Sequence, residues 1–192
     1  AASLSYKLLT TTSPDEARRL AEQLENLNQE RRLYTHESFE QALRILEQRG
    51  ALDHPLLMVS DTEFHPGIVG LVASRLTEEF YRPSVVVELG DPYSKGSARS
   101  NPEFHITDAL DQCADLLVQH GGHAAAAGFT CARDHLDKLE ERLLSLAEEA
   151  LSQQDLVPTL EVDAETPLAS ATWRTLEEIA LMEPFGEENP SP

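Results

Sequence analysis

Three short segments of this 192-residue sequence combine glycine with side chains that bind anions or transfer protons. One of them, 121–128, reads Gly-Gly-His-Ala-Ala-Ala-Ala-Gly. Its small residues let the backbone come close to a ligand, and His123 places one titratable, hydrogen-bonding ring there. Glycines at such a close approach are common in phosphate cradles, so Gly121, Gly122 and His123 are candidate site residues. A glycine pair that ends a helix is the alternative interpretation.

The segment 95–100, Lys-Gly-Ser-Ala-Arg-Ser, is the clearest basic stretch of the chain and contains no acid. Alternation along a strand would put Ser97 and Arg99 on the same face. A guanidinium can bind phosphate through two N–H groups, and neighbouring hydroxyls add donors. A solvent-exposed hairpin strand is the alternative. The candidate phosphate-binding residues here are Lys95, Gly96, Ser97, Arg99 and Ser100.

The third segment, 64–70, reads Phe-His-Pro-Gly-Ile-Val-Gly and is expected to open a helix. Free N–H groups and the positive end of the helix dipole would face any ligand bound there. Gly67 permits close approach, and His65 is a candidate binding residue. A plain Pro-Gly helix start with a surface histidine is the alternative.

Other catalytic or metal-binding chemistry finds little support in the sequence. The histidines at 65, 105, 120 and 123 do not match a compact zinc pattern, and no cysteine or carboxylate cluster joins them. No Gly-x-Ser-x-Gly or Walker sequence occurs. Cys113 and Cys131 lack Cys-x-x-Cys spacing, so we expect buried, reduced thiols in a cytoplasmic protein.

The formal net charge of -19 argues against a protein that coats nucleic acid through a broad basic surface. Charge effects are screened beyond about 8–10 Å at ordinary salt, so a local basic site can still act. The charge therefore predicts local anion binding. No apolar run approaches the length of a membrane span and the first residues do not resemble a signal peptide, so we expect no membrane association.

The elements that must position these residues begin with a short strand expected over 6–11. Ser13 then predicts a helix N-cap, Pro14 the first helical position and Glu16 a capping box. Apolar residues keep helical spacing from there to about Gly50.

Strands and helices alternate through the middle of the chain. Strands are expected over 56–60, 84–89, 94–100 and 128–131, and helices over 67–80, 106–121 and 134–151. This order predicts an α/β (or α+β) fold, a mixed sheet flanked by helices.

The expected domain organisation has three parts: 1–50, a strand and a long linking helix; 51–152, the substrate-binding domain; and 153–192. The last part is expected to hold a strand over 159–162, a helix over 173–181 and a turn-rich end. It is too short to close a core of its own and is expected to begin a further domain.

Taken together, the segments resemble the RecJ single-stranded-DNA exonucleases of the DHH phosphoesterase superfamily. The family pattern runs HPGVIGIVASRL, GSARS and GGHxxAAG, and this chain reads HPGIVGLVASRL at 65–76, GSARS at 96–100 and GGHAAAAG at 121–128, in the same order and spacing. The segment 27–31 is similar to the family's Asn-x-x-Arg linking helix, and 183–190 to the start of its OB-like domain. Phe64 departs from the family, where Trp is usual.

The resemblance implies that Ser97 and Arg99 contact a DNA phosphate, the 5′-terminal one, and that His123 faces the scissile bond. It implies single-stranded DNA and DNA-repair proteins as partners, and a cytoplasmic role in repair and recombination. The family's Mn²⁺ or Mg²⁺ centre lies on a preceding domain with an Asp-His-His run, which this sequence lacks. We therefore expect no metal in this chain and no cleavage by it alone. The alternatives are a DHH-type phosphodiesterase for short oligonucleotides or cyclic dinucleotides, and a non-catalytic nucleic-acid-binding module.

Overall fold

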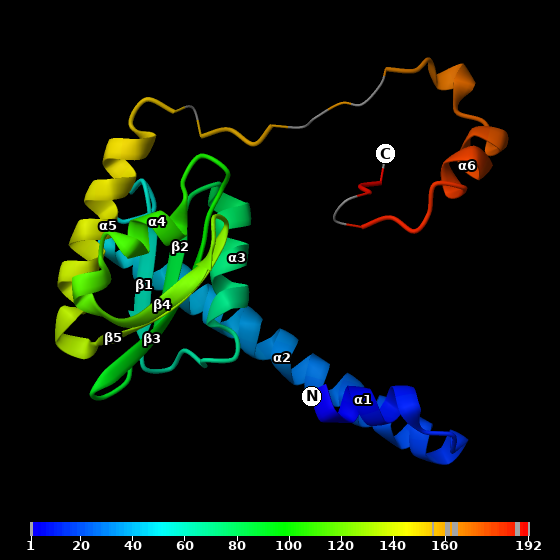
Figure 1. The fold of residues 1–192 in the computed structure, drawn as a ribbon, viewed down its shortest axis with the longest axis horizontal. Helices are drawn as coiled ribbons and strands as arrows, with labels where there is room; N and C mark the ends of the chain where they lie inside the picture. Colours follow the sequence, from blue (N-terminus) through cyan, green and yellow to red (C-terminus); the bar gives the residue numbers. More distant parts are fainter. Residues whose placement is uncertain (1, 155, 160–161, 163–164, 187–188, 192) are drawn as a thin grey trace. The chain divides into compact units, whose positions relative to one another are not determined.

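The computed structural model describes residues 2–154, 156–159, 162, 165–186 and 189–191 (Figure 1). Its contacts divide the chain into two compact units, Ala1–Val157 and Pro158–Pro192. The first unit contains the sheet and the three glycine-bearing segments. Each unit is described by itself.

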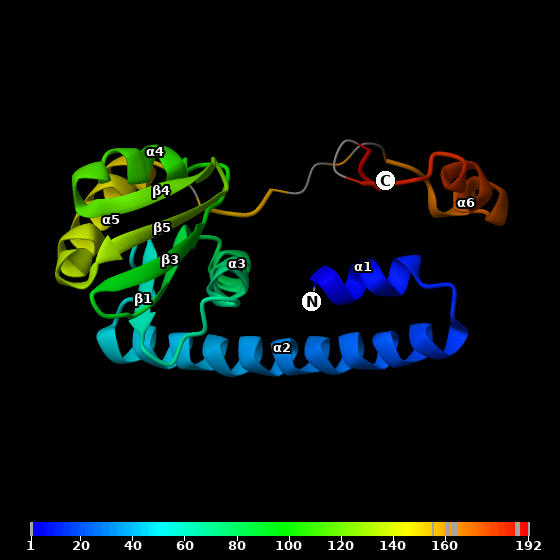
Figure 2. The same ribbon diagram turned by 60° about the horizontal axis from the view of Figure 1, so that its bottom comes forward.

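The first unit starts with a helix, α1 (Ala2–Thr10), where the sequence predicted a strand over 6–11, so that prediction was wrong. Figure 2 shows α1 lying back along the first half of the next helix, α2 (Pro14–Arg49). Leu4 and Leu8 are half-buried and four residues apart, which places both on one side of a helix. Leu8 lines a shared groove with Leu24 of α2. A strand here would need a partner for its backbone groups, and no neighbouring strand lies at this end of the described chain.

The long linking helix, α2 (Pro14–Arg49), agrees closely with its prediction. The Ser13 hydroxyl accepts a hydrogen bond from the Glu16 N–H at 3.4 Å. The Glu16 carboxylate does not close the predicted box on the Ser13 backbone; it accepts a 2.5 Å hydrogen bond from the Thr11 hydroxyl instead. Gly50 ends the helix in the left-handed region with a φ of 62°. The C-terminal part of α2 buries Phe39 and Leu46 against the sheet.

A mixed five-stranded sheet forms the centre of this unit, as predicted (Figure 1). Its strands run in the order β1-β2-β3-β5-β4. Only β1 and β2 are parallel, and the other three pairs are antiparallel. The strands are β1 (Leu57–Asp61), β2 (Ser84–Glu88), β3 (Tyr93–Arg99), β4 (Leu117–His123) and β5 (Ala126–Ala132).

The two faces of the sheet are covered unequally. One face carries α4 (Ile106–Asp111) and α5 (Leu136–Leu151), whose apolar residues form the larger core. The other carries α3 (Val69–Phe80) and the end of α2. Because α3 packs on β2 and β3, the β5 and β4 strands extend past it on that face. This uncovered area borders the start of α3.

The helix predicted over 106–121 was wrong in its second half. It ends as α4 at Asp111, and after a short 3-10 turn the chain enters β4 at Leu117. Helix spacing of the apolar residues continues to 117, but two adjacent glycines oppose a helix and pairing with β5 favours a strand. The pair Gly121-Gly122 therefore lies inside a hairpin and does not cap a helix.

Both cysteines are buried and free, in agreement with the prediction of buried, reduced thiols. Burial raises the pKa of the Cys113 thiol, and that of the Cys131 thiol, to about 11. In the folded chain both thiols are therefore protonated and neutral over the physiological pH range.

The second unit contains the predicted helix as α6 (Trp173–Ala180), with a short 3-10 turn, η3 (Leu168–Ser170), before it. The strand predicted over 159–162 falls partly on residues 160 and 161, which lie outside the described residues. Within the described parts of both units, no helix combines the length and apolar character that crossing a bilayer requires.

Candidate functional site

An open cleft of about 780 Å³ lies beside the start of α3, on the face of the sheet that α3 covers only in part. Its lining comes from 66–71 at the helix start, 95–99 on β3, 119–121 on β4 and 128–130 on β5. All three glycine-bearing segments of the sequence thus contribute to one surface. The mixed order of the sheet brings them together, because β3, β5 and β4 are neighbours.

Two glycines form the floor of this cleft. Gly128 pairs with Ser97 on one side and with Gly121 on the other, so the three residues share one face of the sheet. Both glycines are exposed. A Cβ at Gly121 would meet no atom within 4 Å, and one at Gly128 only the Gly96 carbonyl oxygen at 3.8 Å. A ligand can therefore approach the backbone here without meeting a side chain.

Arg99 forms one wall of the cleft and is held by neutral partners. Its Nη1 donates to the Ser97 hydroxyl at 3.0 Å and to the Ala98 carbonyl at 2.8 Å. Its Nε and Nη2 have no acceptor among the described residues. No Asp or Glu carboxylate of the described residues lies within 4.0 Å of its guanidinium. A half-buried guanidinium that is oriented but lacks a counter-charge favours an anion.

The start of α3 adds backbone donors to this wall. Ile68, at the N-cap position, makes no side-chain cap bond. Val69 and Leu71 donate their N–H groups to backbone carbonyls, whereas those of Gly67 and Gly70 find no acceptor in the described part of the chain. Since the helix dipole is positive at this end, these free donors favour the same anion as Arg99.

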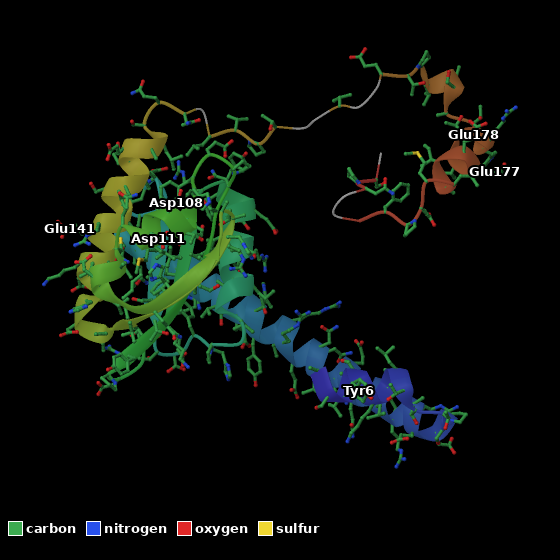
Figure 3. All side chains as sticks on the ribbon, in the orientation of Figure 1. Tyr6, Asp108, Asp111, Glu141, Glu177 and Glu178 are labelled. Carbon is green, nitrogen blue, oxygen red and sulfur yellow. The ribbon has the colours of Figure 1, made fainter. Side chains whose placement is uncertain are left out.

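Some acidic residues of this unit lie on the helices that cover the opposite face of the sheet. Figure 3 labels Asp108 and Asp111 on α4 and Glu141 on α5. Layers on the two sides of a sheet are separated by more than the roughly 8 Å over which charge acts at physiological salt. The acidic residues of α4 and α5 therefore do not exclude an anion from the cleft.

The cleft gathers five of the nine candidate residues. Arg99, Ser97 and the exposed Lys95 supply polar groups, and Gly121 forms part of the floor. Gly96 has a packing role, because a Cβ there would overlap the Phe129 ring.

The other four candidates lie around the cleft without lining it. The Ser100 hydroxyl donates to the Phe104 carbonyl at 2.6 Å. A Cβ at Gly122 would overlap the Ala126 carbonyl oxygen, so this glycine permits the hairpin. The His65 ring stacks on Tyr34 of α2, with 6.4 Å between centroids.

His123 lies at the end of β4, on the edge of the sheet. It pairs with Ala126, which pairs with Arg99, so His123 shares the face that Arg99 uses. Two strand spacings, roughly 10 Å, separate the two residues across the sheet. Its backbone carbonyl accepts a 2.7 Å hydrogen bond from the Thr107 hydroxyl, which fixes this end of β4.

Of the other lining residues, Gly70 and Gly128 end two of the segments identified in the sequence but were not candidate residues, and Gln119 and Thr130 lie outside all three segments. Thr130 pairs with Lys95 and Gln119 with Thr130, so these three share a face across β3, β5 and β4. The alternation of β5 carried the signal for Gly128 and Thr130, but only the strand register relates them to Ser97 and Lys95.

The described residues contain no group of three or more His, Cys, Asp or Glu side chains that could hold a metal ion. His120, which lines the cleft, shares a 2.7 Å hydrogen bond with Asp111 of α4. These residues therefore do not fit a divalent-cation site, and we assign no chemical step to one here.

One family model matches about half of this chain, and curated relatives match nearly all of it. The DHHA1 domain model matches residues 53–153. The single-stranded-DNA-specific exonuclease RecJ of Bacillus subtilis is 35% identical over 187 residues, which cover 96% of this chain and 24% of the relative. RecJ of Escherichia coli is 34% identical over 202 residues, covering 99% of this chain and 34% of the relative. The chain thus spans about a quarter to a third of the curated relatives it matches.

Solved structures of RecJ are also similar to this chain. RecJ from Thermus thermophilus in complex with Mn²⁺ matches with a TM-score of 0.84 and 30% identity, over 100% of this chain and 28% of that one. An exonuclease RecJ bound to manganese matches with a TM-score of 0.68 and 30% identity, over 81% of this chain and 39% of that one.

Proposed function

We propose that this chain, which belongs to the DHHA1 domain family and to the RecJ type within it, holds single-stranded DNA for a 5′→3′ exonuclease. The relatives named above are single-stranded-DNA-specific exonucleases, which supports the substrate class. The parent protein then hydrolyses phosphodiester bonds in DNA repair and recombination in the cytoplasm, together with DNA-repair proteins.

The observation that carries the proposal is the state of Arg99. Its guanidinium is anchored by Ser97 and Ala98, and its Nε and Nη2 have no acceptor among the described residues. Such a pair of N–H groups fits two oxygens of one phosphate. A terminal phosphate carries more negative charge than a diester, so the end of the strand gains most from this site.

The neighbouring groups complete the grip on the strand. Lys95 shares the face of Arg99 and adds a second positive charge on a long stem. The free N–H groups at the start of α3 donate to the phosphate, and the floor of Gly121 and Gly128 admits the sugar–phosphate backbone. Two of the remaining candidates act indirectly: Ser100 fixes the end of β3 and Gly122 permits the β4–β5 turn.

The histidines have roles at the borders of the site. His65 holds the loop before α3 against α2 through its stacking on Tyr34. His123 lies on the face of Arg99 at the free edge, where it meets the next phosphate toward the scissile bond. Hydrolysis belongs to the Mn²⁺ or Mg²⁺ centre of the parent's preceding DHH domain, and this chain alone does not cleave DNA.

Fluorescence anisotropy with a labelled single-stranded oligonucleotide tests the proposal. We expect the chain to bind the 5′-phosphorylated form more tightly than the 5′-hydroxyl form, and Arg99→Ala to abolish that preference. Arg133→Ala removes the same charge from an exposed position outside the cleft, so it is the matched control. Equal affinity of the wild-type chain for both oligonucleotides would exclude recognition of the 5′ end. Cleavage by the isolated chain with Mn²⁺ would contradict its assigned role.

A further inference from the structure

We propose that Gly70 is the positioning residue of the phosphate site: the lack of a side chain on α3 makes the room that the Arg99 guanidinium occupies. This inference rests on the proposed function, because it assigns Gly70 a role in presenting Arg99 to phosphate. Because glycine has no side chain, Gly70 acts in this role through Arg99.

The contacts of Gly70 lead directly to the two site residues. A Cβ built on Gly70 would lie 3.0 Å from Arg99 Nη2, 3.1 Å from the Ser97 hydroxyl oxygen and 3.7 Å from Arg99 Cζ. All three atoms belong to the side chains that form the proposed phosphate grip. Both short distances are tighter than most Cβ contacts in proteins, so the added methyl group would shift these side-chain atoms by a few tenths of an ångström.

The backbone does not explain why residue 70 is glycine. Gly70 is the second residue of α3, and its φ is outside the left-handed region, where Gly50 of α2 lies at 62°. Within a helix, glycine is less favourable than every residue except proline, so alanine would suit the helix better. The Arg99 side chain fills the space that the glycine leaves, and this placement of Arg99 offsets the lower helix propensity of glycine.

Displacement of the guanidinium would weaken phosphate binding although every group of the site would still be present. Arg99 Nη1 lies 3.0 Å from the Ser97 hydroxyl, and a shift of Nη2 away from α3 turns the whole planar group. A bidentate contact with phosphate depends on that orientation. Alanine keeps the N–H of residue 70, so the helix donor stays available. The loss therefore acts through Arg99 and Ser97.

The test is Gly70→Ala, measured in two ways. We expect the affinity for a 5′-phosphorylated oligonucleotide to fall about tenfold, the size of one charged hydrogen bond. We expect the urea midpoint of unfolding to stay the same or rise, because alanine favours the helix. A role in folding alone would instead lower the urea midpoint and leave the affinity of the folded chain unchanged. Gly186→Ala in the second unit adds the same methyl group where no atom lies within 4 Å, and serves as the matched control.

A double-mutant cycle tests whether the effect of Gly70→Ala on affinity acts through Arg99. In an Arg99→Ala background, Gly70→Ala should cost no further affinity. Full affinity of the Gly70→Ala single variant, or an equal loss in both backgrounds, would overturn the inference and leave the proposed function intact. If Arg99→Ala itself keeps the 5′-phosphate preference, the proposed function and the inference both fail.

Discussion

Substitution of Arg99 by lysine separates the two contributions that this residue makes to DNA binding. Lys keeps the positive charge but has a single ammonium group on a flexible stem. It loses the two Nη1 hydrogen bonds, 3.0 Å to Ser97 and 2.8 Å to Ala98, that orient the guanidinium. It also loses the second of the two N–H groups, Nε and Nη2, that have no acceptor among the described residues. One charged hydrogen bond to phosphate is worth about 1.5–3 kcal/mol, which is about 10- to 100-fold in affinity.

The salt dependence of binding distinguishes charge from geometry. Each phosphate contact on a single strand contributes about 0.7 to the slope of log affinity against log salt concentration. Arg99→Lys keeps that contact's charge, so we expect weaker binding with an unchanged slope. Arg99→Ala should lower both the affinity and the slope, the latter by about 0.7.

Anisotropy titrations at four or more salt concentrations would measure both quantities. Lys95→Ala is the companion variant: its slope should fall as for Arg99→Ala, while the preference for a 5′-phosphate remains. Wild-type affinity for Arg99→Lys would show that charge alone suffices. That result would refute the bidentate geometry on which the phosphate site depends.

Two further predictions concern stability. Gly96→Ala should destabilise the fold by about 1–3 kcal/mol in urea unfolding, because its Cβ would overlap the Phe129 ring. Gly121→Ala, whose Cβ meets no atom within 4 Å, should have a free energy of unfolding within about 0.5 kcal/mol of wild type. Equal costs for the two variants would contradict the packing role of Gly96. Burial raises the pKa of the Cys113 and Cys131 thiols from 9.0 to about 11, so their neutral forms stabilise the fold below pH 9 and that contribution is lost as the pH rises from 9 to about 11. Neither thiol should react with a disulfide reagent at pH 8 until urea unfolds the chain, and rapid labelling of the native chain would contradict their burial.

The sequence predicted those elements whose signals are local. Ser13, Pro14 and Gly50 mark the two ends of α2, and the structure places the helix between them. The β-branched run of β2 and the alternation of β3 likewise predict two strands, and both are present. In each case the capping or alternation pattern is complete within the segment itself.

The failures arose where a partner distant in the sequence decides the conformation. Leu4 and Leu8 form a helix because α2 offers them a surface. Helix spacing from Ile106 to Leu117 does not reveal that β5, which begins at Ala126, pairs with this part of the chain. Long-range pairing overrides local periodicity there.

The same division holds for the candidate site. Ser97, Arg99 and Gly121 could be found because glycine, hydroxyl and cation occur together in short segments of an acidic chain. Gly70 and Gly128 end the segments 64–70 and 121–128, but nothing in the sequence places them beside the cation and the hydroxyl. Only the packing of α3 on β3 and the register of β5 relate them to Arg99 and Ser97.

The most direct test of the account is a crystal structure of the chain with a short 5′-phosphorylated single-stranded oligonucleotide. We predict the terminal phosphate beside the start of α3, with its oxygens about 2.7–2.9 Å from Arg99 Nε and Nη2. Arg99 should keep its contacts with Ser97, and the strand should cross the floor of Gly121 and Gly128. A 5′-phosphate bound elsewhere, with the cleft empty, would contradict the central claim.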